Sequence, residues 1–228
     1  MIWLKRFLLV CLAFVFVLNM GVTAQASKPI RRYKNELMKI ALTFDDGPDD
    51  KVTNEILDIL KEYGIKATFF VIGKNCENNL VTLKRIFDDG HEIGNHTYSH
   101  PHLREISGKK LKDEILKTEE IIYSVTNIRP KLFRPPEGFY SEQIDRIREE
   151  LGYVAVLWSV DTLDWTVPKA EKIADVVLNS TSSGVIILCH DYVAGKSNTP
   201  EALRMFIPKL LEQGYEFVTV SEVIYDGS

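Results

Sequence analysis

The chain has 228 residues, of which 28 are basic (Lys and Arg) and 32 are acidic (Asp and Glu), so its formal net charge at pH 7 is −4. This balance offers no dense basic surface of the kind that nucleic-acid-binding proteins carry, and we expect no nucleic acid partner. Three cysteines in a chain of this length also exclude a fold that depends on a disulfide framework.

Residues 1–26 have the layout of a secretory signal peptide. Lys5 and Arg6 form a short basic region, residues 7–20 are apolar and uncharged, and the string AQA at 24–26 supplies small residues at the two positions that signal peptidase reads. Without this segment 26 basic and 32 acidic residues remain, a net charge near −6. The apolar stretch is short for a membrane span. We therefore expect a secreted or cell-wall-associated protein, or a membrane-anchored one if the segment is retained.

The rest of the chain is long enough for one domain with a single substantial core. Residues 27–37 are polar and basic and are predicted to be a linker, and the domain follows at 38–228. Apolar, β-rich runs there alternate with amphipathic segments, which predicts strands alternating with helices. The predicted strands are residues 38–44, 67–72, 91–95, 131–134, 153–158, 184–189 and 215–219. The predicted helices are residues 53–63, 79–89, 109–126, 141–151, 169–180 and 200–213.

Glycine follows four of the predicted helices, at Gly64, Gly90, Gly152 and Gly214. Glycine accepts the left-handed conformation that ends many helices, so each of these residues marks a return to the next strand. Strands joined by helices form a parallel sheet covered by helices, and both a doubly wound sheet and a barrel satisfy this pattern. No glycine-rich phosphate-binding string follows a predicted strand, so a nucleotide-binding fold has no support.

Reactive side chains gather where predicted strands end. The string TFDDGP at residues 43–48 places Asp45 and Asp46 after the first strand, and His96 and His100 follow the third strand four residues apart. One aspartate with the two histidines makes a set of three metal ligands that leaves a coordination position open. The other aspartate is then free to handle a proton, so the set indicates metal-assisted hydrolysis.

Arg134, Asp164 and His190 also lie at or just beyond the ends of predicted strands. In α/β barrels this face carries the active site, so the shared position favours a functional role for all three residues. The alternative for Arg134 is a surface cation before a Pro-Pro turn. For His190 taken alone, a core histidine is the better interpretation.

Five motifs in the same order resemble the polysaccharide deacetylases, also called carbohydrate esterase family 4 or the NodB-homology domain. The motifs are TFDDGP at 43–48, HTYSH at 96–100, RPP at 134–136, DTLDW at 161–165 and LCH at 188–190. The resemblance covers about residues 38–224. It implies an α/β fold, a distorted (β/α) barrel of about seven parallel strands with outer helices. It also implies a divalent metal ion, usually zinc, and hydrolysis of N-acetyl groups on sugars.

The resemblance implies a role for each motif residue. Asp46, His96 and His100 would hold the metal ion, Asp45 would be the general base, and Arg134 would pair with that base. His190 would be the general acid that protonates the leaving amine, and Asp164 would stabilise its charged imidazole. The implied substrate-binding residues are Trp165, Leu188, Pro136 and Glu137. His91 and His102 are not at ligand positions and are expected to be structural or surface residues.

One position departs from the family pattern. Much of the family continues the third motif with Tyr-Gly, where this chain has Glu137 and Gly138. The family uses the backbone N–H at the tyrosine position to stabilise the oxyanion, and Glu137 retains that N–H, but the groove surface becomes acidic. The segment 137–142 is closer to the branch that acts on muramic acid in spore-cortex peptidoglycan, although the arginine common there is absent.

We expect a secreted, metal-dependent hydrolase of amide bonds that deacetylates a cell-wall glycan, with peptidoglycan as the first choice. Chitin oligomers and acetylated xylan are alternative substrates, and the ligand set suits Zn²⁺, with Co²⁺ or Ni²⁺ as alternatives. A non-catalytic glycan-binding barrel is a rival from another class, and so is a metalloenzyme for other amides. A complete set of catalytic positions argues against the first rival. No protein partner is implied, and a Cys76–Cys189 bridge has no support in the sequence.

Overall fold

The structure is a computed structural model that describes residues 28–33, 37–193 and 195–225. The predicted signal peptide, residues 1–26, lies outside the described residues. Among the described residues, no helix combines the length and the apolar character that a membrane span requires.

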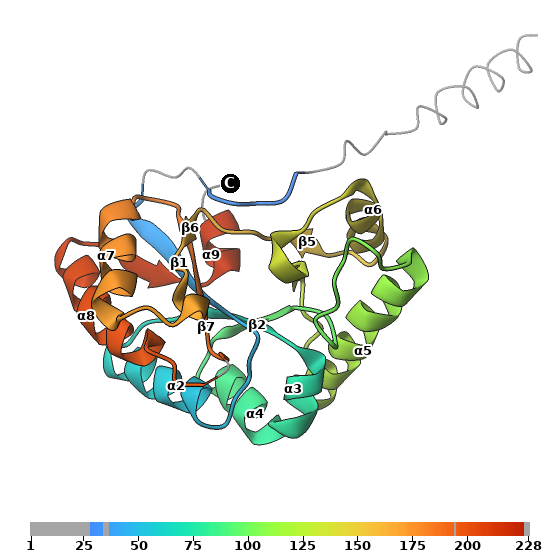
Figure 1. Ribbon diagram of the computed structural model, residues 1–228, viewed down its shortest axis with the longest axis horizontal. Coiled ribbons are helices and arrows are strands. Elements are labelled where there is room, and N and C mark those ends of the chain that lie inside the picture. Colours follow the sequence, from blue (N-terminus) through green and yellow to red (C-terminus); the bar gives the residue numbers. More distant parts are fainter. Residues whose placement is uncertain (1–27, 34–36, 194, 226–228) are drawn as a thin grey trace, which may run out of the picture.

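A single sheet of eight strands forms the centre of the domain (Figure 1). Its order is β5-β4-β3-β2-β1-β7-β6, and every pairing is parallel. The strands are β1 (Lys39–Asp45), β2 (Thr68–Val71), β3 (Glu92–Asn95), β4 (Leu132–Phe133), β5 (Val154–Ala155), β6 (Val160–Asp161), β7 (Ile186–His190) and β8 (Glu216–Val218). In the described part of the chain, no ladder joins the terminal strands β5 and β6, so the barrel is open on that side. The predicted distorted parallel barrel is confirmed.

Strand β1 is the centre of this sheet. It pairs with β7 on one side. On its other side it pairs with two strands, with β8 at Lys39–Ala41 and with β2 at Thr43–Asp45. All but the first residue of β1 is buried. A parallel strand is covered on both faces. This explains why the sequence of β1 is a nearly continuous apolar run and does not alternate between apolar and polar residues.

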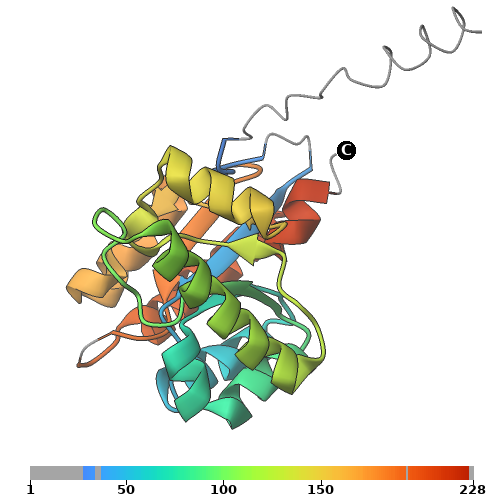
Figure 2. The ribbon, with the colours of Figure 1, turned by 90° about the vertical axis from the view of Figure 1, so that its right-hand side faces the viewer.

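Helices surround the sheet on its outer side (Figure 1). They are α2 (Val52–Glu62), α3 (Gly73–Asn78), α4 (Leu80–Asp88), α5 (Gly108–Thr126), α6 (Glu142–Glu150), α7 (Ala170–Ser180) and α8 (Thr199–Glu212). Helix α2 shows why they pack there, because Ile56, Ile59 and Leu60 recur at helical spacing and are fully buried in the same core cluster as Phe44 of β1. Helix α9 (Val220–Tyr225) instead packs against the other face of the sheet, in one core cluster with Ala41 and Ile186. Figure 2 shows α5 and α6 lying side by side on one flank of the barrel.

Among the described residues, the short elements β6, α3 and α9 were not predicted, and neither were the 3₁₀ helices at Pro136–Gly138 and Asp164–Thr166. Two residues of strand and six residues of helix are too short to show a period of their own. Strand β5 also ends earlier than the predicted run of 153–158, after Ala155. The carbonyl groups of Val156 and Leu157 accept hydrogen bonds from the Arg134 side chain.

Residues 28–33, part of the predicted linker, lie against the open side of the barrel. Ile30 forms a parallel bridge with Val156, and Arg32 forms an antiparallel bridge with Val185, just before β7. The Arg32 guanidinium also donates to Ser182 Oγ at 2.6 Å. This segment, the dark blue stretch in Figure 1, therefore connects the end of β5 to the start of β7.

Candidate active site

The carboxyl ends of β1, β3 and β7 meet at one edge of the sheet, and a cavity of about 490 Å³ opens there. Its lining brings together residues from four of the five sequence motifs and Glu137, which directly follows the third motif. These residues are Asp45, Asp46, His96, His100, Glu137, Trp158, Asp161, Trp165, Leu188 and His190.

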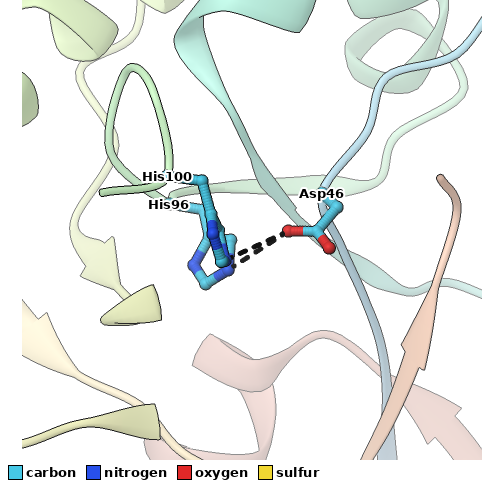
Figure 3. Close-up of side chains that lie close together, drawn as sticks. All are labelled: Asp46, His96 and His100. Carbon is cyan, nitrogen blue, oxygen red and sulfur yellow. Dashed lines mark ion pairs between the residues drawn. The ribbon is translucent and has the colours of Figure 1, made fainter. Parts of the chain in front are cut away.

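Asp46 faces both histidines of the second motif (Figure 3). Its Oδ1 atom lies 3.5 Å from Nε2 of His96 and 3.5 Å from Nε2 of His100. Ligand atoms around a tetrahedral ion with bonds of about 2.1 Å are about 3.4 Å apart, so this spacing fits a bound divalent ion. Asp46 Oδ1 is also buried without a hydrogen-bond partner in the described part of the chain. An unsatisfied buried oxygen is costly, and a cation held by these three residues would satisfy it.

His96 is oriented by the backbone of the third motif. Its Nδ1 atom lies 2.6 Å from the carbonyl oxygen of Arg134. A carbonyl can only accept, so Nδ1 carries the proton and Nε2 presents a lone pair toward Asp46. Burial lowers the pKa of His96, opposed by the charges of Asp45 and Asp46. The neutral imidazole that results is the form that binds metals.

Asp45 is paired with Arg134 beneath the cavity. Both side chains are buried, and Arg134 Nη1 lies 2.7 Å from Asp45 Oδ1. Arg134 also donates to Thr43 Oγ1 at 2.8 Å, and its guanidinium lies over the Phe70 ring. A buried arginine stays charged, so it fixes the Asp45 carboxylate in place and leaves Oδ2 facing the cavity side, 3.7 Å from Nε2 of His96.

His190 and Asp164 form the second charged pair of the site. Asp164 Oδ1 lies 2.7 Å from His190 Nδ1, while Oδ2 accepts from the His190 backbone N–H at 2.8 Å and from Thr199 Oγ1 at 2.7 Å. Burial lowers the pKa of His190, but the hydrogen bond and charge of Asp164, aided by Asp45 and Asp46, outweigh burial and raise the pKa to about 9. His190 therefore carries a proton at neutral pH.

The predicted substrate-binding residues divide into two groups. Trp165, Leu188 and Glu137 line the cavity, whereas Pro136 is buried and is not among the described residues that line it. Arg134 and Asp164 lie behind the lining as well and act through Asp45 and His190. Trp165 is 55% exposed, so its ring is available to a ligand.

Glu137 lies at the rim of the cavity on a left-handed backbone, with φ 58°. Its Oε1 atom lies 2.9 Å from Nδ1 of His102, and both side chains are exposed. His102, expected to be structural or on the surface, is thus a surface residue at this rim. His91 is a buried structural residue, because its Nδ1 accepts from the Ala67 backbone N–H at 3.3 Å.

Two lining residues were given no role from the sequence, Trp158 and Asp161. Asp161 begins the fourth motif, and Trp158 is the last residue of the predicted fifth strand, so the available signal was an aromatic residue at a strand end. Trp158 packs against Gly138, where an added Cβ would lie 2.6 Å from the indole ring. Cys76 and Cys189 are both buried free thiols, and they form no bridge.

Comparison with known proteins agrees with this geometry. The family model for polysaccharide deacetylase matches residues 33–156. A peptidoglycan-N-acetylglucosamine deacetylase of Bacillus cereus is 42% identical over 187 residues, which are 81% of this chain and 87% of that protein. A peptidoglycan-N-acetylmuramic acid deacetylase of Bacillus subtilis is 41% identical over 184 residues, 81% of this chain but only 38% of that protein.

Solved structures show the same similarity. The crystal structure of a peptidoglycan N-acetylglucosamine deacetylase matches with a TM-score of 0.83 at 40% identity, over 87% of this chain and 93% of that one. The parallel barrel, the motif order and these matches agree with one another. The chain therefore belongs to the polysaccharide deacetylase family, a family of metal-dependent carbohydrate deacetylases.

Proposed function

We propose that this protein removes N-acetyl groups from the amino sugars of peptidoglycan with the help of one divalent metal ion. The observation that carries the proposal is the unsatisfied Asp46 Oδ1, equally distant from His96 and His100. The Asp45–Arg134 and His190–Asp164 pairs flank the same cavity. The relatives described above, which are named for peptidoglycan deacetylation, support the choice of substrate.

Asp46, His96 and His100 would hold the ion, which when bound polarises the acetyl carbonyl and lowers the pKa of water. One carboxylate and two imidazoles without a thiolate suit Zn²⁺, and Co²⁺ or Ni²⁺ are the alternatives.

Asp45 and His190 supply opposite halves of the proton chemistry. Asp45 accepts a proton from the attacking water through Oδ2, because Oδ1 is held by Arg134. His190 donates a proton from Nε2 to the leaving amine, because Nδ1 is held by Asp164. An amine leaves poorly without a proton, so the raised pKa of His190 suits an amide substrate.

We infer that N-acetylglucosamine is the preferred sugar, despite the likeness of segment 137–142 to the branch that acts on muramic acid. Glu137 and Asp161 add two carboxylates to the lining, beside Asp45 and Asp46. Muramic acid carries a lactyl group whose carboxylate is an anion wherever no peptide is attached. Like charges at a binding site discriminate against a ligand, so the acidic rim disfavours that sugar.

We also propose that the enzyme works outside the membrane, where peptidoglycan is available. The basic, apolar and small-residue layout of residues 1–26 supports export. A non-catalytic glycan-binding barrel would need neither a base nor an acid. The Asp45–Arg134 and His190–Asp164 pairs are both present here, which argues against that alternative.

The test is acetate release followed by mass spectrometry of purified peptidoglycan, chitin oligomers and acetylated xylan after incubation with the Zn²⁺-loaded protein. We expect glucosamine to appear in peptidoglycan, and His190→Asn to abolish it. Release from xylan or chitin alone would contradict the substrate. The absence of release from every glycan would leave the binding barrel as the better account.

A further inference from the structure

The two loops that carry the metal ligands are held in strained conformations. Asp46, Thr97 and His100 have φ values of 77°, 69° and 51°, in the left-handed region that residues other than glycine rarely adopt. Such conformations persist only where the surrounding structure fixes them. The contacts that fix these loops therefore decide whether the three ligand atoms converge.

Glu114 of α5 holds the loop between the two histidines. Its Oε2 atom accepts from the backbone N–H groups of Tyr98 at 3.0 Å and Ser99 at 2.7 Å, and Oε1 accepts from Ser99 Oγ at 2.9 Å. The side chain is buried, with only 9% of the residue exposed. One carboxylate from another element thus takes three hydrogen bonds from the residues directly between His96 and His100.

Asp191, directly after β7, holds the loop that carries Asp46. Its Oδ1 atom accepts from the Gly47 backbone N–H at 2.9 Å, and Oδ2 accepts from Thr53 Oγ1 at 2.7 Å. Its own backbone N–H donates to the Asp45 carbonyl at 3.2 Å. A Cβ on Gly47 would lie 2.0 Å from Asp191 Oδ2, so a glycine is needed for this carboxylate to reach the backbone beside Asp46.

We propose that Glu114 and Asp191 are positioning residues of the metal centre, each fixing one of the two ligand loops from outside. Neither side chain lines the described cavity, and neither belongs to the proton-transfer pairs. The inference rests on the proposed metal site. It adds that the affinity for the ion depends on two buried carboxylates that are not themselves ligands.

Glu92 offers a matched control within the same fold. Its carboxylate also accepts from a hydroxyl, Thr68 Oγ1 at 3.0 Å, and from a backbone N–H, that of Ser221 at 3.1 Å. It begins β3, at the opposite end of the sheet from the ligands. Glu92→Ala therefore removes a comparable carboxylate without touching either ligand loop.

The experiment measures the Kd for Zn²⁺ by competition with a chromophoric chelator, alongside the absorption spectrum of the Co²⁺-loaded protein. Glu114→Ala and Asp191→Ala should each weaken Zn²⁺ binding by roughly 10–100-fold, as removal of groups behind metal ligands does. Glu114→Gln and Asp191→Asn should restore most of the affinity, because an amide oxygen still accepts the backbone N–H bonds. The Glu92→Ala variant should have a lower unfolding free energy than the wild type in the presence of chelator, but the same Kd for Zn²⁺.

Smaller substitutions decide the matter if an alanine variant does not fold. Ser99→Ala and Thr53→Val each remove one hydrogen bond to these carboxylates, and should weaken Zn²⁺ binding by about three- to tenfold. Wild-type affinity in these variants, or an equal loss in Glu92→Ala, overturns the inference while leaving the proposed function standing. Failure of the wild-type protein itself to bind Zn²⁺, Co²⁺ or Ni²⁺ overturns both.

Discussion

The two ends of the sheet use the left-handed backbone conformation for different purposes. At the amino end, where helices turn back into strands, glycines take most of the left-handed positions: Gly64, Gly90, Gly152, Gly184 and Gly214, with Asn127 after α5 as the exception. At the carboxyl end, residues with side chains take most of them: Asp46, Thr97, His100, Glu137, Leu163 and Val167, beside Gly138 and Gly195.

The space around these residues explains the difference. Nothing lies within 4 Å of the position that a Cβ would take at Gly64 or Gly152, so glycine is present there for its backbone alone. At the carboxyl end the proposed metal ligands Asp46 and His100 take the same conformation, which costs about 1–3 kcal/mol at each residue. One end of the barrel thus favours folding, and the other sacrifices stability for the site.

Asp46→Gly should give the largest effect and test the comparison most directly. Glycine relieves the left-handed strain but removes the carboxylate, so we expect metal binding and activity to be lost. The metal-free protein should be as stable as the wild type or up to about 2 kcal/mol more stable, because the relieved strain outweighs the greater chain entropy of glycine. Elemental analysis and urea denaturation in chelator measure both. Full metal occupancy in this variant would show that Asp46 is no ligand.

Asp45→Asn should separate the base from its neighbouring ligand. We expect catalysis to fall by roughly 10²–10⁴, the range for a lost general base, while the metal remains bound. Asp46→Asn, the control at the next residue, should weaken the metal itself. If the two variants behaved in the opposite way, the roles of the adjacent carboxylates would be exchanged.

Asp164→Asn should shift the pH dependence without changing metal content. Asp164 is the main group that raises the pKa of His190 to about 9, so the basic limb of the kcat/KM profile should move to lower pH. His190 also contributes stability that is fully present below its ordinary pKa of 6.5 and is lost as pH rises through about 9. Urea denaturation across that window should show a smaller pH dependence in the variant. An unmoved basic limb would remove His190 from the role of general acid.

Gly152→Ala should give the smallest effect, confined to the amino end. The new Cβ meets no atom, so only the left-handed backbone is strained, and we expect a loss of about 1–2 kcal/mol in unfolding free energy. The Kd for Zn²⁺ and kcat/KM should match the wild type. A loss of activity here would show that the two ends are coupled more tightly than the comparison implies.

Much of the barrel was predictable because its strands are short apolar runs separated by amphipathic helices that end in glycine. The motif residues of β1, β3 and β7 were predictable too, since parallel strands bring their carboxyl ends to one edge. Trp158 was not, because its place in the cavity depends on where β5 ends and on the turn at Gly138. Glu114 and Asp191 carry no pattern of their own, and their contacts exist only after α5 and β7 have packed.

Residues 28–33 are linked to the proposed general base, Asp45, through consecutive hydrogen bonds. Ile30 accepts a hydrogen bond from the Leu157 N–H at 2.7 Å, and the Leu157 carbonyl accepts from the Arg134 guanidinium that grips Asp45. Removal of residues 28–33 would therefore leave the Leu157 N–H without its partner, beside the carbonyl that helps to hold Arg134 against Asp45. A truncated protein that begins at Lys39, the first residue of β1, would lack the hydrogen bond from Leu157 to Ile30 altogether.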